Sequence, residues 1–406
     1  MRWAVCAPPK KGAQTAIVGK DRENSMAFDF FVQSNIHFGA GAVSALPDIL
    51  RAYGIRKVMA VYGRSVKAAG MAAQVLAQIE KAGADYVVFE GVIPNPTNEV
   101  VEEAAALAKR EQVEGFVAVG GGSCIDLAKA VNVLMTNPGS IGDYAGMNQL
   151  RHACLPLVAI PTTAGTSSEV TNVSALIDTQ KVLKYVVIDN RITPSDVIAD
   201  PEFTRSAPTG VTAATGMDAI THAVESYISN MATPLTAYNS LKGLEILYRN
   251  LPRAVRDGND MEAREQMMLG CIITGFAFSN ANLGFVHAIA HTLSAHFGLA
   301  HGMANACVLP YVMEYNAAVC PEKMVDLAKA IGLTPSGNLD EDRFLLSRAL
   351  LSLIRELKIK TLSEQGISRA DFGMLADDVL REPVLHFNPR QGVTREDVLA
   401  ILDKAF

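Results

Sequence analysis

The uncharged segment 266–313 constrains the fold more than any other part of the chain. It contains no Asp, Glu, Lys or Arg, yet it carries half of the eight histidines, namely His287, His291, His296 and His301. Because apolar burial is favourable and unpaired charge is costly to bury, such a segment is expected in the protein core. A single core histidine most often binds a backbone carbonyl, but neutral imidazole is also the commonest metal ligand. The cluster therefore indicates part of a metal site within buried helices.

The spacing of these histidines limits how they can meet. His287 and His291 are four residues apart and share one face of a helix. His301 follows His287 by 14 residues, about 21 Å along an unbroken helix, whereas a metal–nitrogen bond measures about 2 Å. The chain must therefore turn between them, and Gly298 is of the type that commonly ends a helix. We predict a helix, a turn and a second helix that begins near His301, with His296 on the opposite face as a packing residue.

Length and composition favour a compact enzyme-sized protein with two domains. At 406 residues the chain exceeds what one hydrophobic core usually holds. Its formal net charge of −6 argues against a nucleic-acid partner, and 49% hydrophobic with 19% charged residues is typical of soluble proteins. Polar residues such as Thr274, Ser279 and Asn282 interrupt the segment 266–313 too often for a membrane span.

The cysteines and the first residues carry two further expectations. The six cysteines are scattered and form no C-x-x-C motif, which favours a reducing, cytoplasmic location with structural thiols. Residues 1–25 contain an apolar run too short for a secretion signal, and Pro8-Pro9-Lys10-Lys11 ends it. We therefore predict a disordered leader at 1–25 and a folded chain that begins near Met26.

The first half of the chain alternates apolar strands with amphipathic helices. Strands are expected at 58–62, 86–89, 115–119, 155–160 and 185–188. Helices are expected between them, at 68–81, 98–111 and 125–135. This alternation is typical of a mostly parallel sheet with helices on its faces, and ligands bind beyond the carboxyl ends of such strands. After Pro208 the strand pattern stops, which predicts an α/β domain at 26–205 and an all-helical domain at 206–406.

Three turns in the α/β half have the composition of a nucleotide site. Residues 120–123 (Gly-Gly-Gly-Ser) join a strand to a helix, where glycines let backbone N–H groups approach a phosphate. Residues 161–168 place hydroxyl and small side chains after the next strand, and residues 92–97 form a proline-rich turn before a helix. Each alone is equally consistent with a plain tight turn or a capping turn. Together they make a nucleotide site the better interpretation.

The missing metal ligands lie on an earlier helix. Asp218 and His222 are again four residues apart, which puts a carboxylate and an imidazole on one helical face. In isolation an exposed Asp–His pair explains them as well, but with His287 and His301 they complete a four-ligand set. Imidazole-rich sets suit zinc or iron(II) rather than magnesium or calcium. We find no chemistry at 340–343 or 381–383, which have the composition of solvated loops.

The sequence resembles the iron-containing alcohol dehydrogenase family, from about Phe28 to the C-terminus. The residues that carry the resemblance are Gly120-Gly121-Gly122-Ser123 with Asp126 and Lys129, Pro161-Thr162-Thr163-Ala164-Gly165-Thr166, Thr215-Gly216-Met217-Asp218-Ala219, Thr221-His222-Ala223, Phe278, Asn280-Ala281, Leu283-Gly284, His287, His291 and His301-Gly302. The resemblance implies a dinucleotide-binding α/β domain, an all-helical metal-binding domain and a cleft between them.

The resemblance also implies roles for individual residues. The metal ligands would be Asp218, His222, His287 and His301, and His291 would be a catalytic, non-ligand histidine near the nicotinamide. The NAD or NADP site would be formed by Gly63, Asn95, Gly121, Gly122, Ser123, Asp126, Thr162, Thr163, Thr166 and Lys184. His291 is expected to relay a proton to solvent, although a purely structural role stays open.

Two departures from the family pattern affect these expectations. Many NAD-preferring relatives have an Asp just after the first strand, where this chain has Gly63 followed by Arg64. Loss of the carboxylate removes repulsion against a 2′-phosphate, so we hypothesise that NADPH is accepted. Thr292 and Ser294 also stand where relatives often have Pro and Gly, which alters the wall next to His291.

The expected activity is hydride transfer between nicotinamide C4 and a small alcohol or aldehyde. A divalent metal, Fe²⁺ with Zn²⁺ as the alternative, would act as the Lewis acid. Two alternatives within related enzymes are a polyol dehydrogenase and a lyase that resembles dehydroquinate synthase and uses NAD transiently. A non-catalytic metal-binding scaffold is the third. We expect a homodimer or higher homo-oligomer, and no nucleic-acid or membrane partner.

Overall fold

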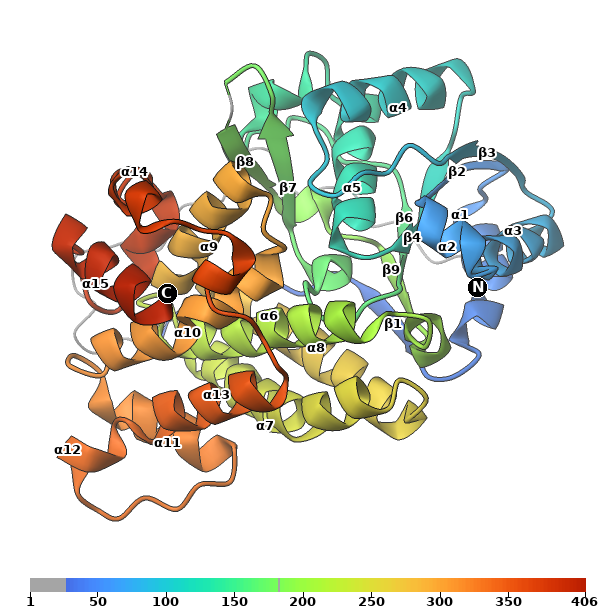
Figure 1. Ribbon diagram of the computed structural model, residues 1–406. Coiled ribbons are helices and arrows are strands. Elements are labelled where there is room, and N and C mark those ends of the chain that lie inside the picture. The colour runs from blue at the N-terminus through green and yellow to red at the C-terminus, as the bar shows by residue number, and fades with distance from the viewer. Residues whose placement is uncertain (1–26, 182) are drawn as a thin grey trace. The chain divides into compact units, whose positions relative to one another are not determined.

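A six-stranded parallel sheet is the scaffold of the first half of the chain (Figure 1). Its strand order is β1-β9-β6-β4-β2-β3, and every neighbouring pair is parallel. The strands are β1 (Asn35–Phe38), β2 (Lys57–Tyr62), β3 (Asp85–Phe89), β4 (Gly115–Gly120), β6 (Leu157–Pro161) and β9 (Asp196–Ala199). The central strands β4 and β6 are buried along their whole length, as expected for a parallel sheet covered on both faces. The predicted α/β fold of this half is confirmed.

The computed structural model describes residues 27–181 and 183–406. The predicted leader at 1–25 therefore lies outside the described residues. Residues Phe31–Phe406 form one compact unit, and everything that follows concerns this unit.

Helices cover both faces of the sheet, because successive strand residues point to opposite sides. Val58 and Ala60 of β2 pack with α1 (Leu46–Tyr53) and α3 (Met71–Ala82), whereas Met59 and Val61 pack with α4 (Asn98–Arg110) and α5 (Gly122–Thr136). The helix predicted at 68–81 is α3, which begins only at Met71 because Gly70 before it adopts a φ of 77°. A separate short helix that was not predicted, α2 (Arg64–Ala68), precedes it.

The chain changes direction across the sheet between β2 and β4. From β2 it continues to β3 on one side, and from β4 it continues to β6 on the other, so that both sides of Val61 are paired (Val61↔Phe89 and Val61↔Ala118). Open α/β sheets bind nucleotides at such a switch point, outside the carboxyl ends of the strands. The turns that begin at Gly63 and Gly121 flank this point.

A second sheet was not predicted. It has the order β5-β8-β7, with β5 (Gly146–Met147), β7 (Val173–Asp178) and β8 (Leu183–Ile188), and β7 pairs with β8 antiparallel. The strand predicted at 185–188 is therefore not part of the main sheet. It pairs with β7, its neighbour in sequence, and a hairpin of this kind is the shortest way to pair two strands.

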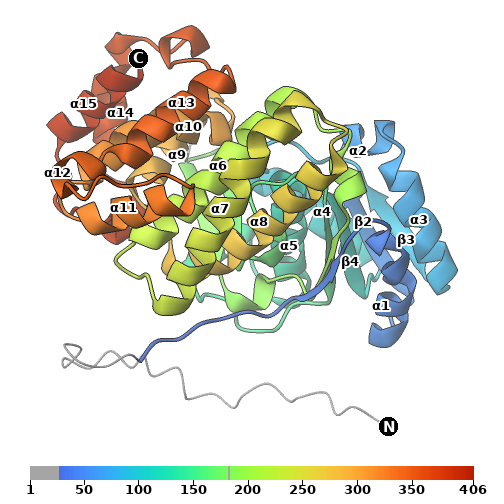
Figure 2. The same cartoon turned by 90° about the horizontal axis from the view of Figure 1, so that it is seen from below.

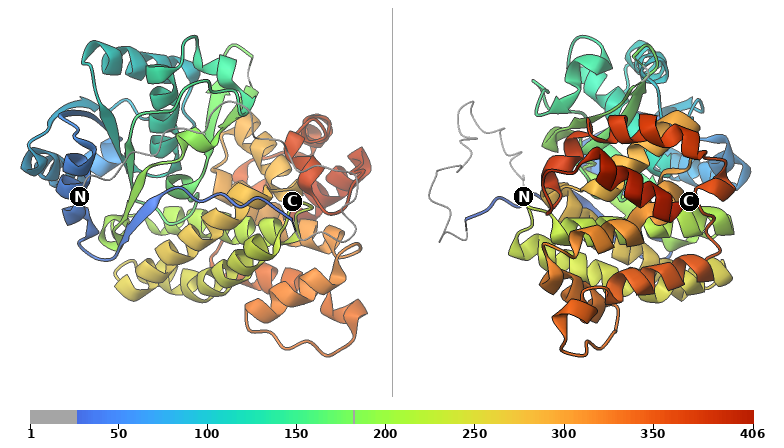
Figure 3. Two further views of the ribbon diagram at one scale, coloured as in Figure 1. Left: turned by 180° about the vertical axis from the view of Figure 1, so that it is seen from behind. Right: turned by 60° about the vertical axis from the view of Figure 1, so that its left-hand side comes forward.

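The second half of the chain is helical, as predicted. Its helices are α6 (Thr209–Ile228), α7 (Pro234–Arg256), α8 (Met261–Ala281), α9 (Phe285–Phe297), α10 (His301–Asn316), α11 (Pro321–Ala330), α12 (Leu339–Asp342), α13 (Leu345–Glu356), α14 (Phe372–Val379) and α15 (Arg395–Ala405). Helices α6, α7 and α8 lie side by side (Figure 2). The later helices α10 to α15 gather on the side away from α1 and α3 (Figure 3). The domain border at 205/206 stays a prediction.

The uncharged segment folds as its histidine spacing predicts. Helix α9 ends at Phe297, Gly298 takes a left-handed φ of 64°, and α10 begins at His301. Most residues of α9 are buried, in agreement with the prediction of core helices. Among the described residues no single helix is long and apolar enough to cross a membrane. Helices α8 and α9 meet that criterion only together, bent by 100° at their junction.

Candidate active site

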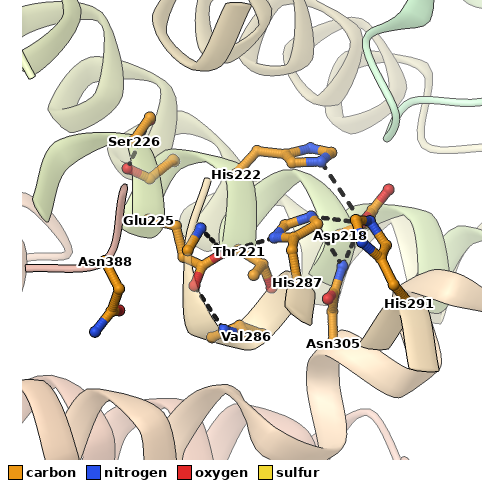
Figure 4. Close-up of polar contacts among 12 residues, drawn as sticks. Asp218, Thr221, His222, Glu225, Ser226, Val286, His287, His291, Asn305 and Asn388 are labelled. Carbon is orange, nitrogen blue, oxygen red and sulfur yellow. Dashed lines mark hydrogen bonds and ion pairs between the residues drawn. The ribbon is translucent and has the colours of Figure 1, made fainter. Parts of the chain in front are cut away.

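Three predicted metal-binding histidines lie around one carboxylate oxygen of the fourth predicted ligand, Asp218. Figure 4 shows His222 and His287 beside this carboxylate. Oδ1 of Asp218 on α6 lies 3.8 Å from Nε2 of His222, 4.0 Å from Nε2 of His287 on α9 and 3.7 Å from Nε2 of His301 on α10. Asp218, His222 and His287 also lie close enough to one another, within 4.8 Å, to share one metal ion. The structure brings the four side chains together, while their role as ligands stays a prediction.

Close contact between two helix backbones places His301 beside Asp218. A Cβ atom on Gly302 would lie 2.0 Å from the carbonyl oxygen of Ala214 and 3.1 Å from Cβ of Asp218. Only glycine therefore allows the first turn of α10 to touch α6. On the other side, the ring of Phe278 stacks on His222 with centroids 4.2 Å apart. These contacts fix two of the imidazoles before any metal is considered.

The chemistry of this donor set fits a divalent transition metal. Ligand bonds of about 2 Å in a tetrahedral site put donor atoms on the order of 3.4 Å apart, close to the separations around Asp218. Burial lowers the pKa of His222 to about 4 and that of His301 well below its usual value, which keeps both imidazoles neutral and able to bind. Three imidazoles with one carboxylate suit iron(II) or zinc better than magnesium or calcium.

A buried carboxylate that sequence reasoning missed holds His287 in place. Glu225 accepts hydrogen bonds from the backbone N–H groups of Gly284 (3.0 Å) and Val286 (2.7 Å), and its Oε2 lies 2.6 Å from Nδ1 of His287. An ionised carboxylate only accepts, so Nδ1 carries the hydrogen and Nε2 offers its lone pair toward Asp218. The sequence did contain a signal that could have revealed Glu225. Its spacing from Asp218 and His222 puts all three side chains along one face of α6.

Asn305 is a second residue that the sequence did not single out. It is fully buried, and its amide Nδ2 donates to Asp218 Oδ1 at 2.7 Å. The same nitrogen lies 3.3 Å from Nε2 of His287 and 3.5 Å from Nε2 of His301. Among the described residues its Oδ1 has no hydrogen-bond partner. Asn305 thus contacts the carboxylate from the side of α10, four residues after His301.

Two other predictions for histidines and loops need correction. Residues 381–383 are not chemically silent, because Oε2 of Glu382 lies 3.1 Å from Nδ1 of His291. His296 is exposed and pairs with Asp378 at 2.8 Å, so it is not a packing residue. Both errors have the same cause, since α14 and the segment after it return to α9 from far along the chain. His291 itself stacks on His301 at a centroid distance of 5.4 Å.

One cavity of about 260 Å³ connects the nucleotide turns to the cluster of predicted metal ligands, Asp218, His222, His287 and His301, which is called the metal cluster below. Its helical end is lined by Asp218, His222, His287, His291 and His301. Its other end is lined by six of the residues predicted to bind the cofactor, namely Asn95, Gly122, Ser123, Asp126, Thr166 and Lys184. A cavity that spans both predicted sites is the geometry that a transfer reaction between a cofactor and a substrate requires.

Steric contact explains the glycines of the predicted phosphate turn. A Cβ on Gly122 would lie 2.8 Å from the side chain of Thr166, and one on Gly121 would lie 3.1 Å from Oγ1 of Thr163. The glycine turn and the threonine turn therefore pack directly against each other at the start of α5. Gly165 lies directly against Thr215 of α6, because a Cβ on Gly165 would lie 2.4 Å from Cβ of Thr215 and 2.7 Å from its carbonyl oxygen. The two halves of the cavity are thus joined through backbone contacts.

The remaining predicted cofactor residues, Gly63, Gly121, Thr162 and Thr163, are not part of the wall of this cavity. Thr163 packs on Gly121, and the backbone N–H of Thr162 donates to Gly120 at 3.1 Å. Gly63 follows β2 at the switch point, where a Cβ would lie 3.7 Å from Val92 in ordinary contact. Helix α2 begins directly after it at Arg64.

Buried charged side chains stabilise the end of the cavity that the nucleotide turns line. The ammonium of Lys129 donates to Ser168 Oγ (3.1 Å) and to the carbonyls of Thr171 and Val173 (both 2.8 Å), and Asp126 accepts from Ser168 at 2.5 Å. Burial raises the pKa of Glu169 to about 7 and lowers that of Lys129 to about 8, and it also raises the pKa of Asp126. This network ties η4 (Ser168–Val170) to α5.

Comparison with known proteins covers almost the whole described chain. Residues 33–201 match the family described as iron-containing alcohol dehydrogenase, and residues 212–406 match its C-terminal part. The 1,3-propanediol dehydrogenase of Klebsiella pneumoniae is 37% identical over 384 residues, which is 93% of this chain and 99% of that protein. The lactaldehyde reductase of Escherichia coli (strain K12) is 35% identical over 385 residues, 94% of this chain and 100% of that protein.

Solved structures agree with the sequence relatives. A structure of 1,3-propanediol oxidoreductase superposes with a TM-score of 0.91 at 36% identity, over 94% of this chain and 100% of that one. An alcohol dehydrogenase from Oenococcus oeni also gives a TM-score of 0.91, at 35% identity with the same coverage. These matches support a dehydrogenase rather than a lyase or a non-catalytic scaffold. The chain therefore belongs to the iron-containing alcohol dehydrogenase family, and it is an oxidoreductase that works with NAD(H) and a divalent metal.

Proposed function

We propose that the protein interconverts small alcohols and aldehydes at the helical end of its cavity. The observation that carries this proposal is one cavity lined by both the nucleotide turns and the imidazole–carboxylate cluster. Relatives named for 1,3-propanediol, lactaldehyde and alcohol support small substrates, and a polyol dehydrogenase is the second candidate. The first half of the chain, near 26–205, would bind the cofactor, and the second, near 206–406, would bind the metal.

The metal would be held by Asp218, His222, His287 and His301. Iron(II) is the first candidate and zinc the second. When bound, such a metal supplies Lewis-acid stabilisation of the negative charge that develops on the substrate oxygen. Glu225 keeps Nε2 of His287 free for it, through the contact of 2.6 Å at Nδ1. Phe278 shields His222 from solvent by stacking on it.

Proton transfer would pass through His291, which lines the cavity and is not one of the four proposed metal ligands. Its Nδ1 lies 3.1 Å from Glu382, whose side chain is 21% exposed. With Nδ1 donating to that carboxylate, the other ring nitrogen can hold the proton of the substrate hydroxyl. Glu382 then connects the imidazole to solvent. His291 would thus be the catalytic acid–base residue, with Glu382 orienting it.

The cofactor would lie across the switch point of the sheet. NAD(P) supplies hydride acceptance at nicotinamide C4 when bound. The pyrophosphate would lie on Gly121, Gly122 and Ser123 at the N-terminus of α5, where backbone N–H groups favour anions. The remaining contacts would come from Asn95, Asp126, Thr162, Thr163, Thr166 and Lys184.

We also propose that NADPH is accepted beside NADH. Gly63 offers no carboxylate at the carboxyl end of β2, and Arg64 and Lys67 follow on α2. Lys67 is bound to Glu90 at 2.8 Å, and this pair is well exposed, so the ammonium can turn toward a phosphate at little cost. Arginine next to a ribose is a recognised way to accommodate a 2′-phosphate.

The test is a panel of alcohols and aldehydes assayed with NAD(H) and NADP(H) after the protein is loaded with iron or zinc. We expect steady formation of reduced cofactor with at least one small alcohol, which a lyase that recycles its NAD would not give. Removal of the metal with a chelator should abolish turnover, and reloading should restore it. Turnover that persists after measured loss of the metal would overturn the assignment.

Location and assembly are further parts of the proposal. We propose a cytoplasmic protein, supported by five cysteines that are free thiols in the described residues. We also propose a homodimer or higher homo-oligomer, supported by the family resemblance alone. Sedimentation analysis of the purified protein measures the assembly state.

A further inference from the structure

Asn282 has a backbone conformation that only glycine usually adopts. It is the C-cap residue of α8, with φ of 60° and ψ of −176°. In this region a Cβ is crowded by the backbone, so a non-glycine residue there is strained. Such strain persists only where the surroundings fix it, and it concentrates at functional sites.

The surroundings of Asn282 fix it firmly beside the metal cluster. Its backbone N–H donates to the carbonyl of Phe278 at 2.8 Å. Two and four residues later, the N–H groups of Gly284 and Val286 are bound by Glu225, which also holds His287. The 100° bend between α8 and α9 lies at this point. Asn282 is therefore held rigidly at the wall of the cavity, which it lines.

The side-chain amide of Asn282 is not used by the protein itself. It forms no hydrogen bond with another group within residues 27–181 and 183–406, and its amide atoms are not fully buried. One turn earlier, Ser279 also lines the cavity, and its Oγ has no partner in the same described residues. The apolar side chains of Phe278, Leu283 and Val384 line the same cavity. A free amide on an apolar wall is the usual means by which a pocket orients a polar ligand group.

We propose that Asn282 binds a second oxygen of the substrate, and that the enzyme favours short diols and hydroxyaldehydes over simple alcohols. This inference rests on the proposed function, because it assigns the substrate end of the same cavity. An amide can both donate and accept, which matches a hydroxyl group. The strained backbone then has a physical reason, since glycine would fit the conformation but would leave the second hydroxyl without a partner.

The test compares the metal-loaded parent with Asn282→Gly. The measured quantity is the ratio of kcat/KM for 1,3-propanediol to kcat/KM for 1-propanol. One neutral hydrogen bond corresponds to a fall in this ratio of about two- to tenfold in the variant. The melting temperature of Asn282→Gly should rise, because the strain is relieved.

A matched control separates recognition from relief of strain. Gln112 also has a positive φ, of 53°, but it is exposed, follows α4 and does not line the cavity. Gln112→Gly should leave the diol-to-alcohol ratio at the parental value. An unchanged ratio in Asn282→Gly would overturn the inference. A higher Kd for NAD⁺ in that variant, with the diol-to-alcohol ratio unchanged, would also overturn the inference and would assign Asn282 to cofactor binding. If the parent oxidised no alcohol at all, the proposed function itself would fail.

Discussion

Nδ1 of His287 lies 2.6 Å from Oε2 of Glu225, and both side chains are only 1% exposed. The carboxylate comes from the same helix as Asp218 and His222, and it also binds the first turn of α9. One side chain therefore sets the position of His287, its tautomer and the direction of its helix. Loss of such an outer partner typically lowers metal affinity by about 10- to 100-fold.

Glu225→Gln should weaken metal binding by about 10- to 100-fold, because the amide cannot accept from all three N–H groups at once. The affinity can be measured by competition of the protein with a chromogenic chelator for Zn²⁺. Ser226→Ala is the matched control, since it removes a buried hydrogen bond to Ser240 from the next position of α6. The control should lower the melting temperature and leave the metal affinity unchanged. Equal metal affinity in Glu225→Gln and the parent would contradict the assigned role.

Gly302→Ala should separate α10 from α6, because the new Cβ would lie 2.0 Å from the carbonyl oxygen of Ala214. We expect a loss of about 3 kcal/mol in the free energy of unfolding and a fall in metal affinity. Gly210→Ala tests the same chemical change at the second residue of α6, where nothing lies within 4 Å. That control should keep or increase stability, since alanine favours a helix. Chemical denaturation and metal titration measure both effects.

Gly63→Asp should shift the cofactor preference toward NADH. The new side chain has room, because its Cβ would meet only Val92, at 3.7 Å. Its carboxylate would repel a 2′-phosphate and accept a hydrogen bond from a ribose hydroxyl. We expect the ratio of kcat/KM for NADPH to that for NADH to fall by about tenfold or more, since 1.4 kcal/mol corresponds to a factor of ten. Gly63→Ala should keep the parental ratio. Rejection of NADPH by the parent protein would refute the premise.

Glu169→Gln should remove a pH dependence of stability between pH 4.5 and 7. Burial raises the pKa of Glu169 from 4.5 to about 7, so the folded protein holds this proton more tightly than the unfolded chain does. The protonated side chain therefore adds about 3 kcal/mol to the free energy of unfolding below pH 4.5, and this contribution is lost as pH rises through 7. The variant should therefore gain stability over the parent as pH rises in this window. Denaturation of the metal-free proteins at several pH values measures the difference, and a constant gap would contradict it.

The uncharged segment and the apolar runs carried enough information to predict most of the fold. Local spacing was sufficient for the central strands and for the break at Gly298, because both depend on neighbours in sequence. The small sheet was missed, since the strand at 185–188 has the same apolar pattern whether it joins a parallel or an antiparallel partner.

The candidate site was predictable where proposed ligands repeat on one helix, and it was not where partners come from distant parts of the chain. Asp218 and His222 share a helical face, which a spacing of four residues reveals. Glu225 meets His287 across 62 residues and Glu382 meets His291 across 91 residues, and no periodicity connects either pair. Asn305 follows His301 at helical spacing, but an amide in an uncharged helix gives no sign of its partner.

With the proposed ligands, the convergence of α6, α9 and α10 on Asp218 would link the supply of metal to the lifetime of the protein. The unfolded chain cannot hold three imidazoles and a carboxylate at one point, so every bound ion adds to the stability of the folded form alone. Free metal at 1,000 times its Kd would add about 4 kcal/mol. A cell short of metal would then hold not only less active enzyme but less enzyme, because the ion-free chain opens more often and is degraded sooner.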